Sequence, residues 1–375
     1  MVVLIFITAI VLLVIARHSS DKTLGILAAF IMMFLLVVGN HTNLDWENYA
    51  EGYSAELDGH PTEWLYFVLR SWSKSVFGLS YEWFRFFLSL LAFLFMFFAI
   101  NKYIDTKNEY FCDILLLYIM FPFFWSIPVN RNFIGFAFFL FSVRYLSVFS
   151  IRNVLLYLFF IILAGGIQAS FLLCILFLAV YALNNDGIIS KLFKIGIAAL
   201  FAVTFFPDSF LGPVQDYMTL IGDDRLRYVE EVQTKYGYFV AIFKQLLLFF
   251  AARYGYNIVK QYSNVSKTDA SYRFIKTVYL LTIVAFVFCP LYRIQANFTR
   301  MINNIIPLIY IQYACVMTVL HKEHGFLLRK RLLKRYSSIV VVIAAFFMIL
   351  LIIPHWEDIY LPALTDNWIL NLIIP

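Results

Sequence analysis

Three arginines beside apolar segments carry the strongest chemical signal in this sequence. Arg131 opens one apolar run, and Arg293 and Arg300 flank the start of another. Ionisable groups at membrane depth are costly and usually functional. A guanidinium group stays charged at an interface and can bind phosphate through two hydrogen bonds. The arginines therefore predict a site for a phosphorylated lipid; the alternative is that they anchor the chain to lipid headgroups.

Carboxylates and aromatic rings gather in the stretch 40–69, which contains no Lys or Arg. Asp45 is followed by Trp46 and Tyr49, and Glu63 comes later. Aromatic faces beside a carboxylate can hold a sugar, and a carboxylate can also accept a proton from a hydroxyl as a general base. We expect Asp45 and Glu63 to be catalytic and the two rings to contact substrate. An aromatic belt at a membrane interface is the alternative.

The composition predicts an all-α, polytopic integral membrane protein. Hydrophobic residues make up 62% of the 375 residues and charged residues 14%, whereas soluble domains average about 25% charged. Apolar runs predict about twelve transmembrane segments, and some are shorter than the roughly 20 residues of a full crossing, as in broken helices. The runs are 2–16, 24–39, 82–100, 111–127, 132–149, 153–164, 167–183, 190–206, 238–258, 274–290, 298–320 and 337–353.

The distribution of lysine and arginine predicts the orientation. Basic residues fall in alternate loops, and short cytoplasmic loops carry this excess. Both termini are then outside, and residues 1–375 form a single transmembrane domain. Its outer parts are the loops 40–81 and 207–237 and the tail 354–375. The net charge of +6 then reflects cytoplasmic anchoring, and we exclude nucleic acid as a partner.

No motif for a metal, a nucleotide or a disulfide framework occurs in the sequence. The four cysteines lie in or beside apolar runs without a CxxC spacing, so they are interpreted as buried apolar residues. A phosphate-cradling glycine loop and a nucleophile elbow are also missing. We expect no metal site and no cofactor, so the energy for any reaction must come from the substrate.

Gly165 and Gly166 separate two short apolar runs, 153–164 and 167–183. Glycine interrupts a helix and allows backbones to approach closely. The two runs form either a tight hairpin or a broken helix pair that lines a cavity. The sequence leaves both alternatives open.

The order of these motifs resembles the EpsG family, whose members resemble Wzy-type polysaccharide polymerases. The similarity extends from about residue 40 to about residue 310. An early Asp-Trp-x-x-Tyr motif is matched by Asp45, Trp46 and Tyr49. A Glu-Pro-x-aromatic motif is matched in part, by Glu63 with Pro61 displaced.

Later motifs of the family are also present, with two departures. An Ile-Arg-Gln motif corresponds to 129–132, where Arg131 is kept and Asn132 replaces Gln. A Phe-His-x-Ser motif corresponds to 167–170, where Gln168 replaces His. A late Arg before an apolar run is matched by Arg300. Because glutamine can only donate and accept hydrogen bonds, position 168 cannot supply a base, and either a carboxylate does so or this chain has lost an activity of the family.

The resemblance implies a multi-pass glycosyltransferase at the outer face of the bacterial cytoplasmic (inner) membrane. It would polymerise oligosaccharide repeat units carried on polyprenyl diphosphate, for O-antigen, capsule or exopolysaccharide. Membrane lipids and a chain-length regulator are further expected partners. The expected catalytic residues are Asp45, Glu63, Arg131 and Arg300, and the expected substrate contacts are Trp46, Tyr49, Asn132, Gln168 and Arg293.

A transporter or flippase of lipid-linked oligosaccharide is the alternative function. Twelve spans and broken helices fit that class, but secondary transporters often contain inverted repeats and midplane charges. We find no repeat, and the charge candidates lie at the outer face, which favours an enzyme. A third candidate, an acyltransferase, would need a catalytic His or Ser motif, and we find none.

Overall fold

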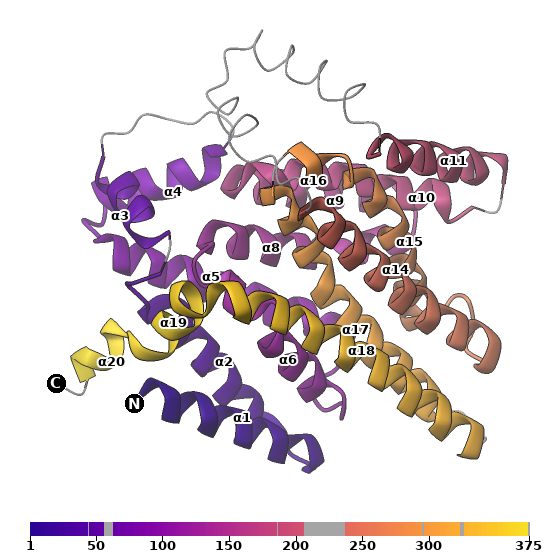
Figure 1. Ribbon diagram of the computed structural model, residues 1–375, viewed down its shortest axis with the longest axis horizontal. Helices are drawn as coiled ribbons and strands as arrows, with labels where there is room; N and C mark the ends of the chain where they lie inside the picture. The colour runs from indigo at the N-terminus through magenta and orange to yellow at the C-terminus, as the bar shows by residue number, and fades with distance from the viewer. Residues whose placement is uncertain are drawn as a thin grey trace, which may run out of the picture.

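The computed structural model describes residues 1–43, 45–55, 63–185, 187–205, 237–294, 296–322 and 326–373. Every regular element in these ranges is a helix, which confirms the all-α prediction. Figure 1 shows the helices as a bundle in which many lie tilted in the same direction. Such an arrangement is expected of apolar helices that must satisfy their backbone groups internally.

The first half of the chain forms mostly short helices, several of them interrupted. They are α1 (Val2–His18), α2 (Thr23–Gly39), α3 (Trp46–Ser54), α4 (Trp64–Ser75), α5 (Tyr81–Tyr103), α6 (Phe111–Met120), α7 (Phe123–Ser126), α8 (Asn130–Ser142), η2 (Val143–Ser147), α9 (Ile151–Ile167), η3 (Ala169–Leu178) and α10 (Ala179–Leu183).

The second half contains the longer helices and ends in a series of short ones. They are α11 (Ile188–Val203), α14 (Gly237–Tyr262), α15 (Ala270–Val284), η4 (Ala285–Phe288), α16 (Leu291–Ile294), η5 (Ala296–Thr299), α17 (Arg300–Lys322), α18 (Phe326–His355), η6 (Trp356–Tyr360), α19 (Leu361–Thr365) and α20 (Trp368–Ile373).

Five helical segments in the described ranges are long and apolar enough to cross a membrane. They are Tyr81–Tyr103, Gly237–Tyr262, Ala270–Phe288, Arg300–His321 and Lys330–Leu372. Shorter apolar helices accompany them: Val2–His18, Thr23–Gly39, Phe111–Met120, Ile151–Ile167 and Ala169–Leu183. The helices are those of a membrane protein, while the number of twelve spans and the outward termini stay predictions.

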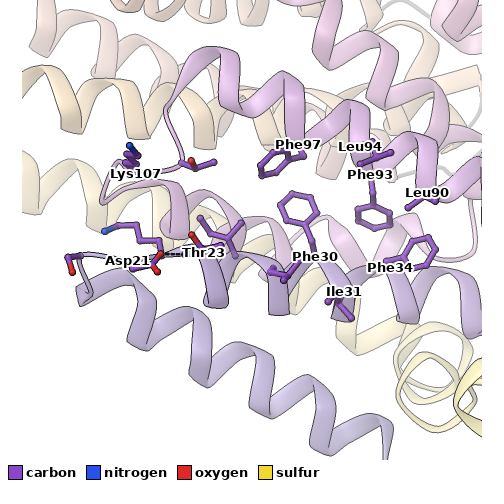
Figure 2. A pocket seen from close by; sticks show the side chains of 15 residues that line it. Asp21, Thr23, Phe30, Ile31, Phe34, Leu90, Phe93, Leu94, Phe97 and Lys107 are labelled. Carbon is purple, nitrogen blue, oxygen red and sulfur yellow. Dashed lines mark hydrogen bonds between the residues drawn. The ribbon is translucent and has the colours of Figure 1, made fainter. Parts of the chain in front are cut away.

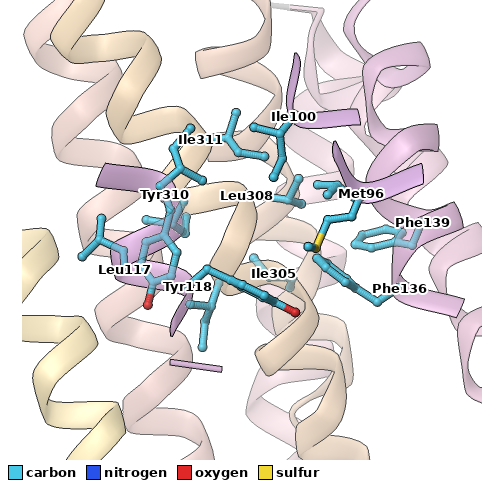
Figure 3. Close-up of a cluster of buried hydrophobic side chains, with 14 of the residues drawn as sticks. Met96, Ile100, Leu117, Tyr118, Phe136, Phe139, Ile305, Leu308, Tyr310 and Ile311 are labelled. Carbon is cyan, nitrogen blue, oxygen red and sulfur yellow. The ribbon is translucent and has the colours of Figure 1, made fainter. Parts of the chain in front are cut away.

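Helix α17 lies at the centre of the packing. Of its most apolar window, 89% is buried, more than in any other of the five segments. Figure 3 shows its side chains against those of α5, α6 and α8. The labelled members of this cluster are Met96, Ile100, Leu117, Tyr118, Phe136, Phe139, Ile305, Leu308, Tyr310 and Ile311. Arg300 is therefore carried by a helix that its neighbours hold in place.

The interruption expected at Gly165 and Gly166 lies at Gln168 instead. Both glycines belong to α9, and Gln168 is extended, with φ −142° and ψ 110°, before η3 begins. The glycines serve packing, because a Cβ at Gly165 would lie 2.4 Å from Leu172 Cδ2 and one at Gly166 would lie 2.8 Å from Leu65 Cβ. The pair is thus a helix broken after its glycines, with α4 pressed against its end.

The predicted outer segments contain more helix than expected. Loop 40–81 holds α3 and α4, and the tail from 354 forms η6, α19 and α20. The tail returns to the start of the chain, since α19 packs on α1 and α2 and α20 packs on α2 (Figure 1). Apart from Gly237, the predicted loop 207–237 lies outside the described residues, as does Pro61.

Candidate active site

Glu63 and Arg131 form an ion pair at the start of two helices. Glu63 precedes α4, and Arg131 lies in the first turn of α8. Arg131 Nη1 lies 2.5 Å from Glu63 Oε2, and the side chains are only 28% and 12% exposed. A pair with so little exposure is screened less by water than a surface pair. The pair therefore fixes the position of the Arg131 guanidinium.

Two tyrosine rings enclose the same guanidinium. The Arg131 Cζ atom lies 4.9 Å from the ring centre of Tyr49 on α3 and 5.3 Å from that of Tyr66 on α4. Both distances are within the range of cation–π attraction. Tyr49 was expected from the sequence, whereas Tyr66 was not, because nothing in its local pattern shows that the start of α4 lies beside Arg131.

The other oxygen of Glu63 reaches the interrupted helix. The backbone N–H of Ala169, at the start of η3, donates to Glu63 Oε1 (3.3 Å). The first N–H groups of a helix have no partner within it, so a carboxylate suits this position. Gln168 is the adjacent residue and is half-buried, and Ser170 Oγ is buried without a hydrogen-bond partner among the described residues. The motif at 167–170 therefore lies beside Glu63.

The charges of both catalytic arginine candidates act on Asp45. It precedes α3, and its carboxylate does not cap that helix. Burial raises the pKa of Asp45 above its ordinary value, while the positive charges of Arg300 and Arg131 lower it; burial prevails. A carboxylate with a raised pKa is a better proton acceptor than an ordinary one. The structure thus pairs Glu63 with Arg131 and places Asp45 within electrostatic range of Arg131 and Arg300.

Arg300 differs from Arg131 in having no fixed partner. In the described part of the chain it makes no hydrogen bond and no ion pair within 4 Å, and its Nε atom is buried. Buried polar groups are nearly always hydrogen-bonded in native proteins. A half-buried guanidinium without a partner in the described chain is suited to an anionic ligand.

Asn132 links the helices that carry the two arginines. Its side-chain amide and that of Asn304 on α17 donate to each other, at 3.1 Å and 3.3 Å. Both residues are buried. Asn303 Oδ1, beside this pair, is buried and has no partner among the described residues. The role of Asn132 as a substrate contact stays a prediction, because its amide already bonds to α17.

Trp46 packs on a cation that the sequence analysis did not select. The Arg85 Cζ atom lies 5.1 Å from the Trp46 ring centre, and Arg85 donates to the carbonyls of Asn40 (2.8 Å) and Ile127 (3.1 Å). Arg85 is 2% exposed. An arginine within the apolar run 82–100 is itself the signal that could have found it.

Arg293 lies in a different environment from the other arginines. It donates to the carbonyl of Thr204 (3.0 Å) at the end of α11, and its Cζ atom lies 4.6 Å from the Tyr238 ring on α14. These contacts hold α16 to its neighbours. A role for Arg293 in binding substrate stays a prediction.

The comparison with known families identifies the family of the chain. A sequence model of the EpsG family matches residues 22–362, nearly the whole chain. This chain belongs to the EpsG family. The EpsG family is a Wzy-type polymerase family, so the resemblance drawn from Asp45, Glu63, Arg131 and Arg300 is confirmed. No curated protein and no solved structure matches the chain.

Membership of the EpsG family indicates a polymerase-type glycosyltransferase of surface polysaccharide biosynthesis. Within the described ranges, no group of three His, Cys, Asp or Glu residues has the geometry to hold a metal ion. The chemistry that the site offers comes from two carboxylates, two guanidinium groups and three aromatic rings.

Proposed function

We propose that this EpsG-family protein joins oligosaccharide repeat units, each carried on polyprenyl diphosphate, at the outer face of the bacterial cytoplasmic membrane. The observation that carries the proposal is that the charges of Arg300 and Arg131 both act on the half-buried Asp45 carboxylate, while Arg131 is held in an ion pair with Glu63. A base beside two phosphate-binding cations is what glycosyl transfer from a lipid diphosphate requires.

In the proposed reaction, Asp45 takes the proton of the acceptor hydroxyl. The acceptor oxygen forms a bond to the anomeric carbon of the donor glycan, and the bond from that carbon to the diphosphate oxygen breaks. The electron pair leaves with the polyprenyl diphosphate. Arg300 stabilises the charge that develops there, because its half-buried side chain has no hydrogen-bond or ion-pair partner in the described chain; Arg131 contributes a second positive charge.

Glu63 has a supporting role in this proposal. Its oxygens accept hydrogen bonds from Arg131 Nη1 and from the Ala169 N–H. Glu63 therefore fixes the position of the start of α8 relative to the start of η3. Asp45 makes no side-chain hydrogen bond in the described chain, which leaves its oxygens free for a hydroxyl. The structure therefore favours Asp45 over Glu63 as the base.

The first experiment compares the surface glycans of a strain that lacks this gene with those of the parent. Loss of the long glycan ladder, with single repeat units still displayed, supports the polymerase. Loss of all surface repeats, with lipid-linked units accumulating in the cytoplasm, supports a flippase and contradicts the proposal.

The second experiment tests phosphate recognition by Arg131 and Arg300. A lysine keeps the positive charge but lacks the planar fork that binds phosphate through two hydrogen bonds. Losing a hydrogen bond to a charged group costs about 1.5–3 kcal/mol, or roughly 10- to 150-fold. We expect Arg131→Lys and Arg300→Lys each to shorten the glycan chains at unchanged membrane abundance.

Arg293→Lys is the matched control, because Arg293 contacts Thr204 and Tyr238 rather than the candidate site. We expect a milder effect there. Chains of normal length in both site variants would exclude the role in diphosphate binding and favour the transporter alternative.

A further inference from the structure

A groove separate from the candidate active site runs between α2 and α5, on the side of the bundle. Its volume is about 750 Å³, within the range of about 300–1,000 Å³ for ligand sites. Figure 2 shows phenylalanine rings of both helices facing each other along it: Phe30 and Phe34 from α2, and Phe93 and Phe97 from α5. The middle of the groove is therefore apolar.

One end of the groove is polar and positively charged. Lys22 and Thr23, at the start of α2, and Lys107, in the loop after α5, line this end, together with Asp21 (Figure 2). Lys22 is 7% exposed and donates to the Ser19 carbonyl (2.7 Å), which uses one of the three N–H groups of an ammonium.

Asp21 carries a negative charge at the same end of the groove, but its carboxylate already accepts a hydrogen bond from the backbone. Its Oδ1 atom accepts from the Thr23 N–H (2.9 Å). Two ammonium groups and one carboxylate leave a positive balance at this end. A phosphate group is the natural counterpart of such a set.

The groove opens toward the surroundings of the bundle. Its rim includes Leu27, which is 54% exposed, Ile31, which is 49% exposed, and Leu94, which is 47% exposed. Exposed aliphatic side chains on a membrane helix face lipid tails. A ligand can therefore enter sideways from the bilayer, which a water-soluble metabolite could not do.

We propose that this groove binds an anionic phospholipid of the cytoplasmic leaflet. The phosphate lies at Lys22 and Lys107, and the acyl chains lie along the phenylalanine rings. The basic-loop pattern predicts that this end faces the cytoplasm, where negatively charged lipids attract such lysines.

The lipid-linked substrate is not the occupant, because the charged end is remote from the reacting groups. Helix α2 starts at the groove's polar end and leads at its other end to Asp45. It has 17 residues, so its length is about 26 Å at 1.5 Å per residue. A diphosphate held at Lys22 could not reach Arg300 as well.

The test measures bound lipid in the full-length protein after reconstitution into vesicles of phosphatidylglycerol and phosphatidylcholine. Native mass spectrometry of the re-extracted protein counts the phosphatidylglycerol that remains. We expect Lys22→Gln and Lys107→Gln each to reduce it about fivefold. Lys102→Gln is the control, since Lys102 is an exposed lysine at the end of α5 that does not line the groove.

A second variant tests the apolar part without changing charge. Leu94→Trp places a larger side chain in the groove, so it should reduce the bound lipid while all lysines remain. Equal retention in Lys107→Gln and Lys102→Gln would overturn the proposal. Retention of as much phosphatidylcholine as phosphatidylglycerol by the wild-type protein would also overturn it. Displacement of phosphatidylglycerol by added polyprenyl phosphate would do the same.

Discussion

At the residue scale, Arg131 and Arg300 differ in what they already contact. The charge of Arg131 is balanced by Glu63 at 2.5 Å and its faces are covered by Tyr49 and Tyr66. Arg300 has no such partner in the described chain. A ligand phosphate therefore gains more from Arg300, whereas Arg131 has the more fixed position.

Asp45 and Glu63 should differ in how much the polymerisation rate falls when each loses its charge. Asp45→Asn removes the proposed base and should lower the polymerisation rate by about 10²–10⁴-fold. Glu63→Gln removes only a charged hydrogen-bonding partner of Arg131, so a loss of about 10- to 150-fold is expected. Rates in membranes of matched protein content decide between them; a larger loss for Glu63→Gln would make Glu63 the base.

The pH dependence of the reaction should report on Asp45. A base must be deprotonated, so activity falls as the pH drops through the pKa of Asp45, which burial raises above its ordinary value. Arg300 lowers this pKa. Arg300→Gln should therefore move the acid limb of the pH profile to higher pH, whereas Arg300→Lys, which keeps the charge, should leave it nearly unchanged. An acid limb at the same pH in wild type and Arg300→Gln would contradict the assignment.

The sequence was sufficient to name these residues but not to pair them. Asp45, Glu63, Arg131 and Arg300 stood out by residue type and by motif. The contact of Glu63 with Arg131 spans 68 positions and depends on the close packing of α4 against Gly166. Local patterns contain no information on which distant helix fills the space beside a glycine, so this contact had to come from the structure.

At the element scale, the tail supports the segment that carries Asp45. Asp366 Oδ2 accepts from the His41 N–H (2.6 Å) and the Thr42 hydroxyl (3.3 Å). The Trp368 ring stacks on His41, with centres 5.8 Å apart, and His41 in turn lies 4.6 Å from the ring of Trp46. The chain end is thus connected to the candidate site through His41.

Asp366→Ala should therefore impair polymerisation from outside the site. It leaves the His41 N–H without its charged acceptor, at a cost of about 1.5–3 kcal/mol for the loop conformation. We expect shorter glycan chains at normal membrane abundance. Glu357→Gln, an exposed change in the same tail, is the control, and chains of wild-type length in Asp366→Ala would show that the tail does not position Asp45.

The apolar runs predicted the apolar helices better than the helices of the predicted outer segments. Most runs correspond to helices within a few residues, because burial of apolar surface and internal hydrogen bonding leave little choice in a membrane. The helices α3 and α4 were not predicted as such. Helix α4 begins with an apolar run, 64–69, and ends with mostly polar residues. Its stability depends on packing against α9, which no local pattern reveals.

At the scale of the whole molecule, the predicted orientation places the candidate site outside. Single cysteines at Asn48 and Glu357 should react with an impermeant thiol reagent added to intact cells, and those at Lys107 and Lys267 should not. All four positions are exposed, and the native cysteines are buried, which keeps the background low. Labelling with the reverse sidedness would move the candidate site to the cytoplasm and remove the basis for an outer-face polymerase.

The reciprocal amide bonds between Asn132 and Asn304 have a consequence for selectivity. Asn132 follows Arg131 directly, and Asn304 lies one helical turn after Arg300, so these bonds set the spacing of the two helix ends that carry the positive charges when the protein folds. An incoming anion does not have to order these helix ends, which removes part of the entropic cost of association. The spacing also selects anions by length. An anion that reaches both cations gains binding free energy from each, whereas a single phosphate gains it from only one. The recognised feature would then be the headgroup shared by all repeat units, whatever sugars they carry.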